Sequence, residues 1–200
     1  MTIAASLTPL TLTGRLIRLE PLRRDHLEGL VAAARDGQMW DRWYTGVATP
    51  DTMADQIEDR LRLQESGWML PFTTIRQADD TVIGATTFCD IALDVPRVEI
   101  GYTWNCESAH GTGTNPESKL LLMTHAFETL GCECVRFQTH WMNQQSRTAI
   151  ERLGAHLDGV LRCDRVDGEG RLRDTVVYSV VAREWPMVKA GLEHRLRRRR

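Results

Sequence analysis

The stretch RVEIGYTWNCESAHGTGTNPESKLLLMTHAFETLGCECVRFQTHW, residues 97–141, contains the pattern that decides the fold. It opens and closes with segments of strand composition, RVEIGYTWN and CVRFQTHW. Between them, a glycine loop leads into a helical stripe made of Leu120, Met123, Phe127 and Leu130. Because hairpin patterns precede this strand–helix–strand unit, we expect a mixed sheet with helices on its faces.

The glycine loop of this stretch is a candidate anion site. Gly111 and Gly113 lie directly before the predicted start of the helix. Asn115 is a favourable N-cap there, and Pro116 suits the first turn. Free N–H groups and the positive end of the helix dipole converge at this point. The chain after Gly113 lacks the GK[ST] of a Walker loop and the third glycine of a dinucleotide fingerprint. A plain glycine turn between strand and helix is the alternative.

The rest of the chain continues the alternation of strands and helices. Strand patterns occupy residues 15–22, 68–77, 81–91, 156–166 and 171–182. Helical patterns occupy residues 24–35, 49–67, 116–130, 143–155 and 183–196. Short turn sequences between consecutive strands predict two hairpins.

Composition and charge exclude several classes of protein. With 42% hydrophobic and 26% charged residues, the chain has the composition of an ordinary globular domain. The formal net charge of -2 argues against a polyanionic partner such as DNA. The arginine-rich tail, 195–200, is interpreted as a solvated end. The acidic remainder of the chain favours cationic substrates.

Several further features are absent from the sequence. The first ten residues lack the pattern of a signal peptide, and no apolar run could span a bilayer. Five irregularly spaced cysteines predict no disulfide framework, which fits a reducing cytoplasm. There is no HExxH or paired CxxC motif, so no metal is expected.

The loop and its flanking strands resemble the GNAT acetyltransferase superfamily. HGTGTN (110–115) is similar to the motif Q/R-x-x-G-x-G/A, which wraps the pyrophosphate of acetyl-coenzyme A in that family. His110 stands in place of Gln or Arg, and Asn115 in place of the last small residue. EIGYTW (99–104) looks like the central strand whose bulge lets the pantetheine arm pair with backbone. WMNQQSRTAIERLGA (141–155) looks like the later motif N-x-x-S-x-x-x-x-x-x-L-G-A/F.

The resemblance extends over most of the chain, about residues 12–182. The start LTGRLIRLEPLRRDHLEGL (12–30) is similar to the Rim-type branch, which contains ribosomal-protein N-terminal acetyltransferases. The implied fold is α/β (α+β), with a mixed, mostly antiparallel central sheet of about seven strands and about four flanking helices. We expect a single acetyltransferase domain, 1–200, with a C-terminal helix and arginine tail at 183–200.

The resemblance implies two candidate catalytic residues. Glu99 takes the position of a carboxylate that accepts the amine proton, directly or through water. Ser146 is the candidate donor to the leaving thiolate, because Ile150 stands where many relatives have a tyrosine. A solvated strand carboxylate and a first-turn helix serine are the alternatives for these two residues.

Cofactor and acceptor residues follow from the same resemblance. The predicted cofactor-binding residues are Tyr102, Thr103, Trp104, His110, Gly111, Thr112, Gly113, Thr114, Asn115 and Asn143. Trp40, Trp43 and Tyr44 belong to an aromatic loop that, in this fold, borders the acceptor pocket. With Asp41 they could hold a cationic amine, and a hydrophobic lid is the alternative.

These expectations together describe an acetyl-coenzyme A-dependent N-acetyltransferase of the Rim-like branch. The expected acceptor is a protein N-terminus or a small primary amine. No metal, membrane or DNA partner is expected, and a homodimer is left open. The alternatives are a non-catalytic coenzyme A-binding module, docking on RNA through the arginine tail, and transfer of a longer acyl group.

Overall fold

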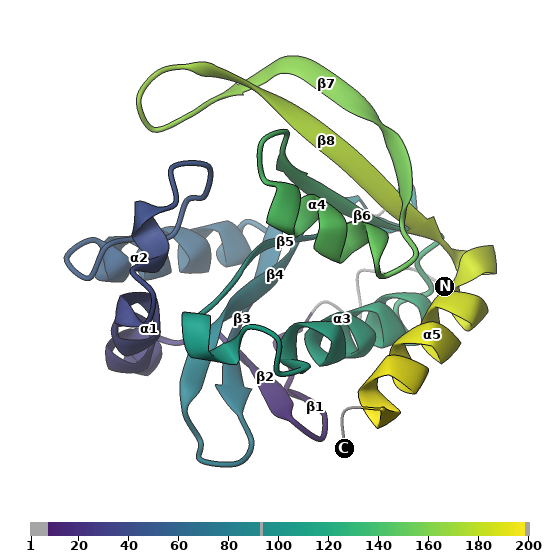
Figure 1. Ribbon diagram of the computed structural model, residues 1–200, viewed down its shortest axis with the longest axis horizontal. Coiled ribbons are helices and arrows are strands. Elements are labelled where there is room, and N and C mark those ends of the chain that lie inside the picture. The colour runs from purple at the N-terminus through teal and green to yellow at the C-terminus, as the bar shows by residue number, and fades with distance from the viewer. Residues whose placement is uncertain (1–7, 93, 199–200) are drawn as a thin grey trace.

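Eight strands form one sheet in the computed structural model, which describes residues 8–92 and 94–198 (Figure 1). Their order is β1-β2-β3-β4-β5-β6-β8-β7. The bounds are β1 Leu12–Thr13, β2 Ile17–Pro21, β3 Met69–Arg76, β4 Val82–Ala92, β5 Arg97–Asn105, β6 Cys134–His140, β7 His156–Val166 and β8 Leu172–Val181. Every neighbouring pair is antiparallel except β5 and β6, which confirms the predicted mixed, mostly antiparallel sheet.

Within the described residues, the sheet has one strand more than the about seven that the resemblance implied. The added strand is β1, whose two residues are too few to show an alternation in the sequence. The prediction that the chain starts without a signal peptide falls partly on residues 1–7, which lie outside the described residues. The arginine tail ends at residues 199–200, which also lie outside them.

Within the described residues, five α-helices accompany the sheet, one for each helical pattern and one more than the about four that the resemblance implied. Their bounds are α1 Leu27–Arg35, α2 Met53–Glu65, α3 Thr114–Thr124, α4 Gln144–Glu151 and α5 Trp185–Arg197. A π-helical turn, His125–Thr129, extends α3. α1 contacts β4, α2 contacts β3, and α3 contacts both β2 and α5. In Figure 1 the β7–β8 hairpin extends over α4 toward the segment between α1 and α2. Within the described ranges, no helix is long and apolar enough to cross a bilayer.

The start of α3 differs from the prediction. The helix begins at Thr114 and not at Asn115 and Pro116, and Gly113 is its N-cap in a left-handed conformation (φ 99°). The chain turns into the helix through this positive φ, which glycine adopts without a steric penalty. An Asn side chain is therefore not the cap. Pro116 still fits, because N–H groups of the first turn have no partner within the helix.

The central strands carry the core. Residues 69–75 of β3 and 83–89 of β4 are all buried, which is the pattern of strands covered on both faces. Phe72 and Phe88 meet edge to face at 6.0 Å between ring centroids. Threonines interrupt the apolar runs, and Thr86 of β4 is fully buried. The interior beside β4 is therefore partly polar.

A buried carboxylate fixes α3 to the N-terminal turn of the sheet. Glu117 accepts backbone N–H groups of Arg15, Leu16 and Ile17 at 3.1, 2.6 and 2.9 Å. A Cβ at Gly14 would lie 2.6 Å from Glu117 Oε2, so this approach requires glycine. The position of the glycine loop that precedes α3 thus depends on a contact about 100 residues away in sequence.

Replacing this carboxylate should destabilise the fold. In Glu117→Gln one acceptor oxygen becomes an NH2 donor that faces backbone N–H groups, so we expect the free energy of unfolding to fall by about 2 kcal/mol. Urea unfolding followed by circular dichroism measures this. Glu65→Gln, at the exposed end of α2, is the matched control and should leave stability unchanged. Equal stability of the two variants would contradict the role given to Glu117.

Candidate active site

The site lies where β5 and β6 separate. These parallel strands pair at Arg97 with Cys134, Val98 with Val135 and Glu99 with Arg136, and their register ends there. β6 continues its pairing with β8 as far as His140. Over the rest of β5, the edge that faces away from β4 is not paired with β6. Backbone groups on that edge are available to a ligand.

A bulge in β5 begins directly after this point. Ala85 pairs with Trp104 and Thr87 with Gly101, so one residue of β4 opposes two of β5. Tyr102 has a φ of 50°, which is uncommon for a residue other than glycine. Tyr102 and Thr103 are both exposed, whereas Trp104 is buried. The bulge that the family resemblance implied is therefore present, and it changes the alternation of side chains after Gly101.

The glycine loop between β5 and α3 is held by short-range hydrogen bonds. The hydroxyl groups of Thr112 and Thr114 both donate to the carbonyl oxygen of Ala109, at 2.7 and 3.2 Å. His110 Nε2 lies 3.1 Å from the carbonyl oxygen of Asn105, so its ring folds back on the end of β5. A Cβ at Gly111 would meet no atom within 4 Å, which shows open space beside the loop. The loop and the N-terminus of α3 form a cradle, residues 110–115, that suits an anion.

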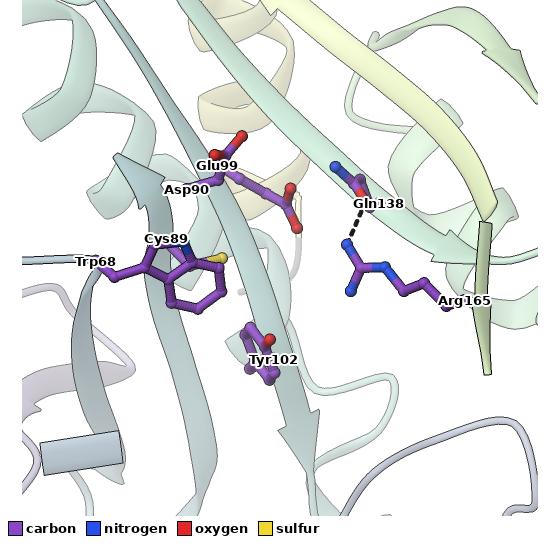
Figure 2. Close-up of a pocket in the computed structure, with 7 residues that line it drawn as sticks. All are labelled: Trp68, Cys89, Asp90, Glu99, Tyr102, Gln138 and Arg165. Carbon is purple, nitrogen blue, oxygen red and sulfur yellow. Dashed lines mark hydrogen bonds between the residues drawn. The ribbon is translucent and has the colours of Figure 1, made fainter. Parts of the chain in front are cut away.

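A cavity of about 210 Å³ adjoins the start of β5 (Figure 2). Its lining residues come from β4, β5, β6, β7 and the residue before β3: Trp68, Cys89, Asp90, Glu99, Tyr102, Gln138 and Arg165. Figure 2 shows Trp68 and Tyr102 across the cavity from the Arg165–Gln138 pair, which is joined by a hydrogen bond of 2.8 Å. Two carboxylates and two aromatic rings suit a cationic amine.

Burial controls the charge of the groups around this cavity. Glu99 is 6% exposed, and burial raises the pKa of its carboxyl, although Arg165 acts in the opposite direction. Burial also raises the pKa of the neighbouring Cys89 thiol, which stays protonated. The guanidinium carbon of Arg60 lies 5.7 Å from the ring centroid of Tyr102, one of the lining residues. Burial lowers the pKa of Arg60 to about 10. A carboxyl group with a raised pKa is a stronger base than an exposed one and is suited to accept a proton.

The predicted later helix carries its candidates as expected. Asn143 is the N-cap of α4, and its Oδ1 accepts the N–H of Ser146 at 2.9 Å. Ser146 is partly buried in the first turn of α4, and Ile150 is a buried core residue. The catalytic role of Ser146 stays a prediction.

The predicted aromatic loop lies apart from the cavity. None of Trp40, Trp43 and Tyr44 is among the residues that line it. The Trp43 ring lies 5.2 Å from the ring of His140, and Arg171 of the β7–β8 turn lies above it at 5.7 Å. The loop, which connects α1 and α2, therefore contacts the end of β6 at His140. Its role in acceptor binding stays a prediction.

Sequence patterns missed most of the cavity wall. Trp68, Asp90, Gln138 and Arg165 come from four separate segments, and no spacing rule joins them. The alternation in sequence places Asp90 in a strand, but it does not show that this residue lies near the end of β4, close to the start of β5. Over residues 8–92 and 94–198, no group of three or more His, Cys, Asp or Glu side chains could hold a metal ion.

Comparisons with known sequences agree with this geometry. A family model described as an acetyltransferase (GNAT) domain matches residues 16–156. The curated protein "Putative ribosomal N-acetyltransferase YdaF" of Bacillus subtilis (strain 168) is 35% identical over 89 residues. That alignment covers 44% of this chain and 48% of YdaF, so it spans about half the length of this relative.

Solved structures agree over a larger share of the chain. A GCN5-related N-acetyltransferase from Brucella melitensis is 28% identical with a TM-score of 0.81, over 94% of this chain and 85% of that chain. A "putative acetyltransferase" from T. thermophilus is 34% identical with a TM-score of 0.82, over 94% and 98%. RimJ of Mycobacterium smegmatis, in complex with CoA-disulfide, is 20% identical with a TM-score of 0.79, over 94% and 95%, and this likeness shows the fold alone.

The family model spans well over half of the chain, and the fold is shared almost from end to end. The predicted family is therefore confirmed: the chain belongs to the GNAT acetyltransferase superfamily, with Rim-type ribosomal-protein acetyltransferases among its structural neighbours.

Proposed function

We propose that this enzyme uses acetyl-coenzyme A to acetylate a primary amine, and that the amine is a protein N-terminus or a small amine. The observation that carries the proposal is the position of Glu99, a buried carboxyl at the point where β5 leaves β6. The cavity lies beside this residue, and the open edge of β5 begins directly after it. One strand can thus present a donor groove and an acceptor cavity within a few residues.

The residues present fit the cofactor. Gly111 and Gly113 have φ values of 75° and 99°, so the loop can approach a pyrophosphate closely at the N-terminus of α3. Residues 110–115 would hold the pyrophosphate, and the backbone of Tyr102, Thr103 and Trp104 would hold the pantetheine arm, with Asn143 beside it. When bound, acetyl-coenzyme A supplies the acyl group as a reactive thioester. The description of RimJ as a complex with CoA-disulfide supports this assignment.

Glu99 would serve as the general base. An amine attacks only in its neutral form, so the carboxylate accepts a proton from the ammonium group, directly or through one water. Asp90 adds negative charge to the same cavity, while Trp68 and Tyr102 provide aromatic surfaces. Backbone N–H groups of the bulge would stabilise the developing oxyanion, and Ser146 would donate to the leaving thiolate.

A protein N-terminus is the favoured acceptor because several relatives are described as ribosomal-protein acetyltransferases. Trp40, Trp43 and Tyr44 would then contact the chain that follows the acetylated residue. The reducing cytoplasm stays the expected location, because the spacing of the five cysteines predicts no disulfide framework. The alternatives are transfer of a longer acyl group and coenzyme A binding without catalysis.

A charge placed in the cradle should abolish cofactor binding. Gly113→Asp adds a Cβ at a positive φ and a negative charge beside the expected pyrophosphate, so we expect no acetyl-coenzyme A binding at millimolar concentration. Isothermal titration calorimetry measures it. The control is Gly168→Asp in the β7–β8 turn, where a Cβ meets no atom within 4 Å. Equal affinity of the two variants would show that the cradle is wrongly assigned.

Removing the proposed base should separate catalysis from folding. The carboxylate form is required, and burial raises its pKa, so the wild-type rate should rise with pH through that raised value. Glu99→Gln should lower the rate about 100-fold and lose this rise. Because a raised pKa makes the ionised wild type less stable as pH increases, Glu99→Gln should be at least as stable at pH 8.

The rate is measured as release of free thiol with an amine acceptor, and stability as the midpoint of thermal unfolding. Glu133→Gln, an exposed carboxyl just before β6, is the matched control and should keep the wild-type pH profile. A Glu99→Gln enzyme with the wild-type rate would remove Glu99 from the mechanism.

A further inference from the structure

One buried cation is not used by the mechanism above. Lys119 of α3 is 5% exposed, and its Nζ donates to Thr103 Oγ1 at 2.7 Å and to Thr86 Oγ1 at 3.5 Å. The two threonine hydroxyls are also 2.8 Å apart. Lys119 therefore connects α3, which carries the cradle at its N-terminus, to Thr103 in the β5 bulge.

Among the residues that the structure describes, no carboxylate forms an ion pair with this amine. On the same helix, Glu117 is directed to the N–H groups of the β1–β2 turn. His125, in the π-helical turn, lies against Phe88 of β4. On β4, an ionised Cys89 would raise the pKa of Lys119, but burial keeps this thiol protonated and uncharged. β5 contributes the neutral Thr103 hydroxyl. Within the described residues, Lys119 takes part in no ion pair. Burial consequently lowers its pKa to about 7.

The choice of lysine is informative in this chain. Of its 25 basic residues, only Lys119 and Lys189 are lysines, and all others are arginines. Arginine keeps its charge at any physiological pH, whereas lysine can lose it when it is buried. Lys189 lies on the surface of α5 and binds Glu128. The chain thus has a basic group that can change its charge directly beneath the proposed cofactor groove.

Two residues next to this contact in sequence have buried polar side-chain atoms without a hydrogen-bond partner among the described residues. Trp104 Nε1 and Ser118 Oγ are buried, and neither has a hydrogen-bond partner among the described residues. They are the chain neighbours of Thr103 and Lys119. Thr103 itself is exposed at the bulge. A ligand that lies along the bulge would therefore contact one end of a hydrogen-bonded chain whose other end is the Lys119 amine.

We propose that Lys119 is a positioning residue for the cofactor: it holds the β5 bulge through Thr103 and takes up one proton when a polyanionic acyl donor occupies the cradle and groove. In the free protein the amine is poorly solvated and has no counter-ion within residues 8–92 and 94–198, so the ammonium form is disfavoured. Phosphate charge nearby makes the ammonium form more favourable. The proton comes from solvent and binds to Nζ, and no covalent bond of the ligand changes. The inference rests on the proposed function, since it assumes that acetyl-coenzyme A binds in this groove.

The sign of the linkage gives a pH dependence for binding. Above pH 7 the free protein holds Lys119 as a neutral amine, so binding must add a proton. The dissociation constant should then increase by up to about tenfold per pH unit, until the pKa of the bound state is reached. Below pH 7 the amine is already protonated, and this contribution is constant.

Nuclear magnetic resonance can follow the amine directly. Lysine labelled with ¹³C at Cε gives two side-chain signals, and Lys189→Arg identifies the one that belongs to Lys119. In the free protein, the Lys119 signal should titrate near pH 7. With saturating acetyl-coenzyme A and no acceptor, its midpoint should rise by at least about one unit. A midpoint near pH 10 in the free protein, the value of an exposed lysine, would overturn the inference.

Binding measured across pH 6 to 9 tests the linkage itself. The wild-type dissociation constant should increase above pH 7, whereas that of Lys119→Met should be weaker at pH 7 and nearly independent of pH. Lys189→Met, which removes the surface lysine, should follow the wild type. Calorimetry in two buffers of different ionisation enthalpy should show proton uptake in the wild type and none in Lys119→Met.

The outcomes separate this inference from the proposed function. If the wild type binds acetyl-coenzyme A but the Lys119 signal does not move, only the inference is wrong. If the wild type does not bind at all, the proposed function fails and the inference fails with it. If Lys119→Met does not fold, the titration of the wild-type signal decides alone.

Discussion

The structure depends on the point at which β5 and β6 stop pairing. They share three register pairs and separate after Glu99, because β5 bulges away while β6 stays with β8. Parallel strands that continued together would satisfy each other's backbone and leave no groove. The separation leaves an edge of β5 open to a ligand and makes room for the cavity beside Glu99. A donor and an acceptor can therefore meet at one strand.

An open edge must be held in place by the surrounding fold. Glu117 does this on one side, since its carboxylate accepts three backbone N–H groups and fixes α3, and with it the cradle, to the sheet. The strongly buried strands β3 and β4 support the other side of β5. The ionisable groups of the site work against stability, because Glu99 and Lys119 are buried with no close ion-pair partner among the described residues. The anchoring contacts allow both groups to stay where they are.

The sequence predicted the elements well and the site only in part. The strands and helices followed from alternation and helical spacing, while β1 was too short to detect and Gly113 replaced Asn115 as the cap of α3. Glu99 and residues 110–115 could be predicted because they lie in one continuous stretch that resembles the family, and their roles stay predictions. The other cavity residues come from strands that only the tertiary fold brings together. Lys119 could have been found, because it shares a helix face with Leu122, Met123 and Ala126, which are all fully buried.

Desolvation explains how the two ends of the site can have opposite chemistry. Burial raises the pKa of Glu99 and lowers that of Lys119 to about 7, so in both groups the neutral form is favoured relative to an exposed side chain. Without a bound anion, the neutral amine of Lys119 adds no positive charge to the site. A bound anion favours the ammonium form of Lys119, and this positive charge attracts the anion. Glu99 faces a cavity suited to a cationic amine, whose charge favours the carboxylate form in the same way. Each ligand thus favours the protonation state that binds it, and an arginine in place of Lys119 could not respond in this manner.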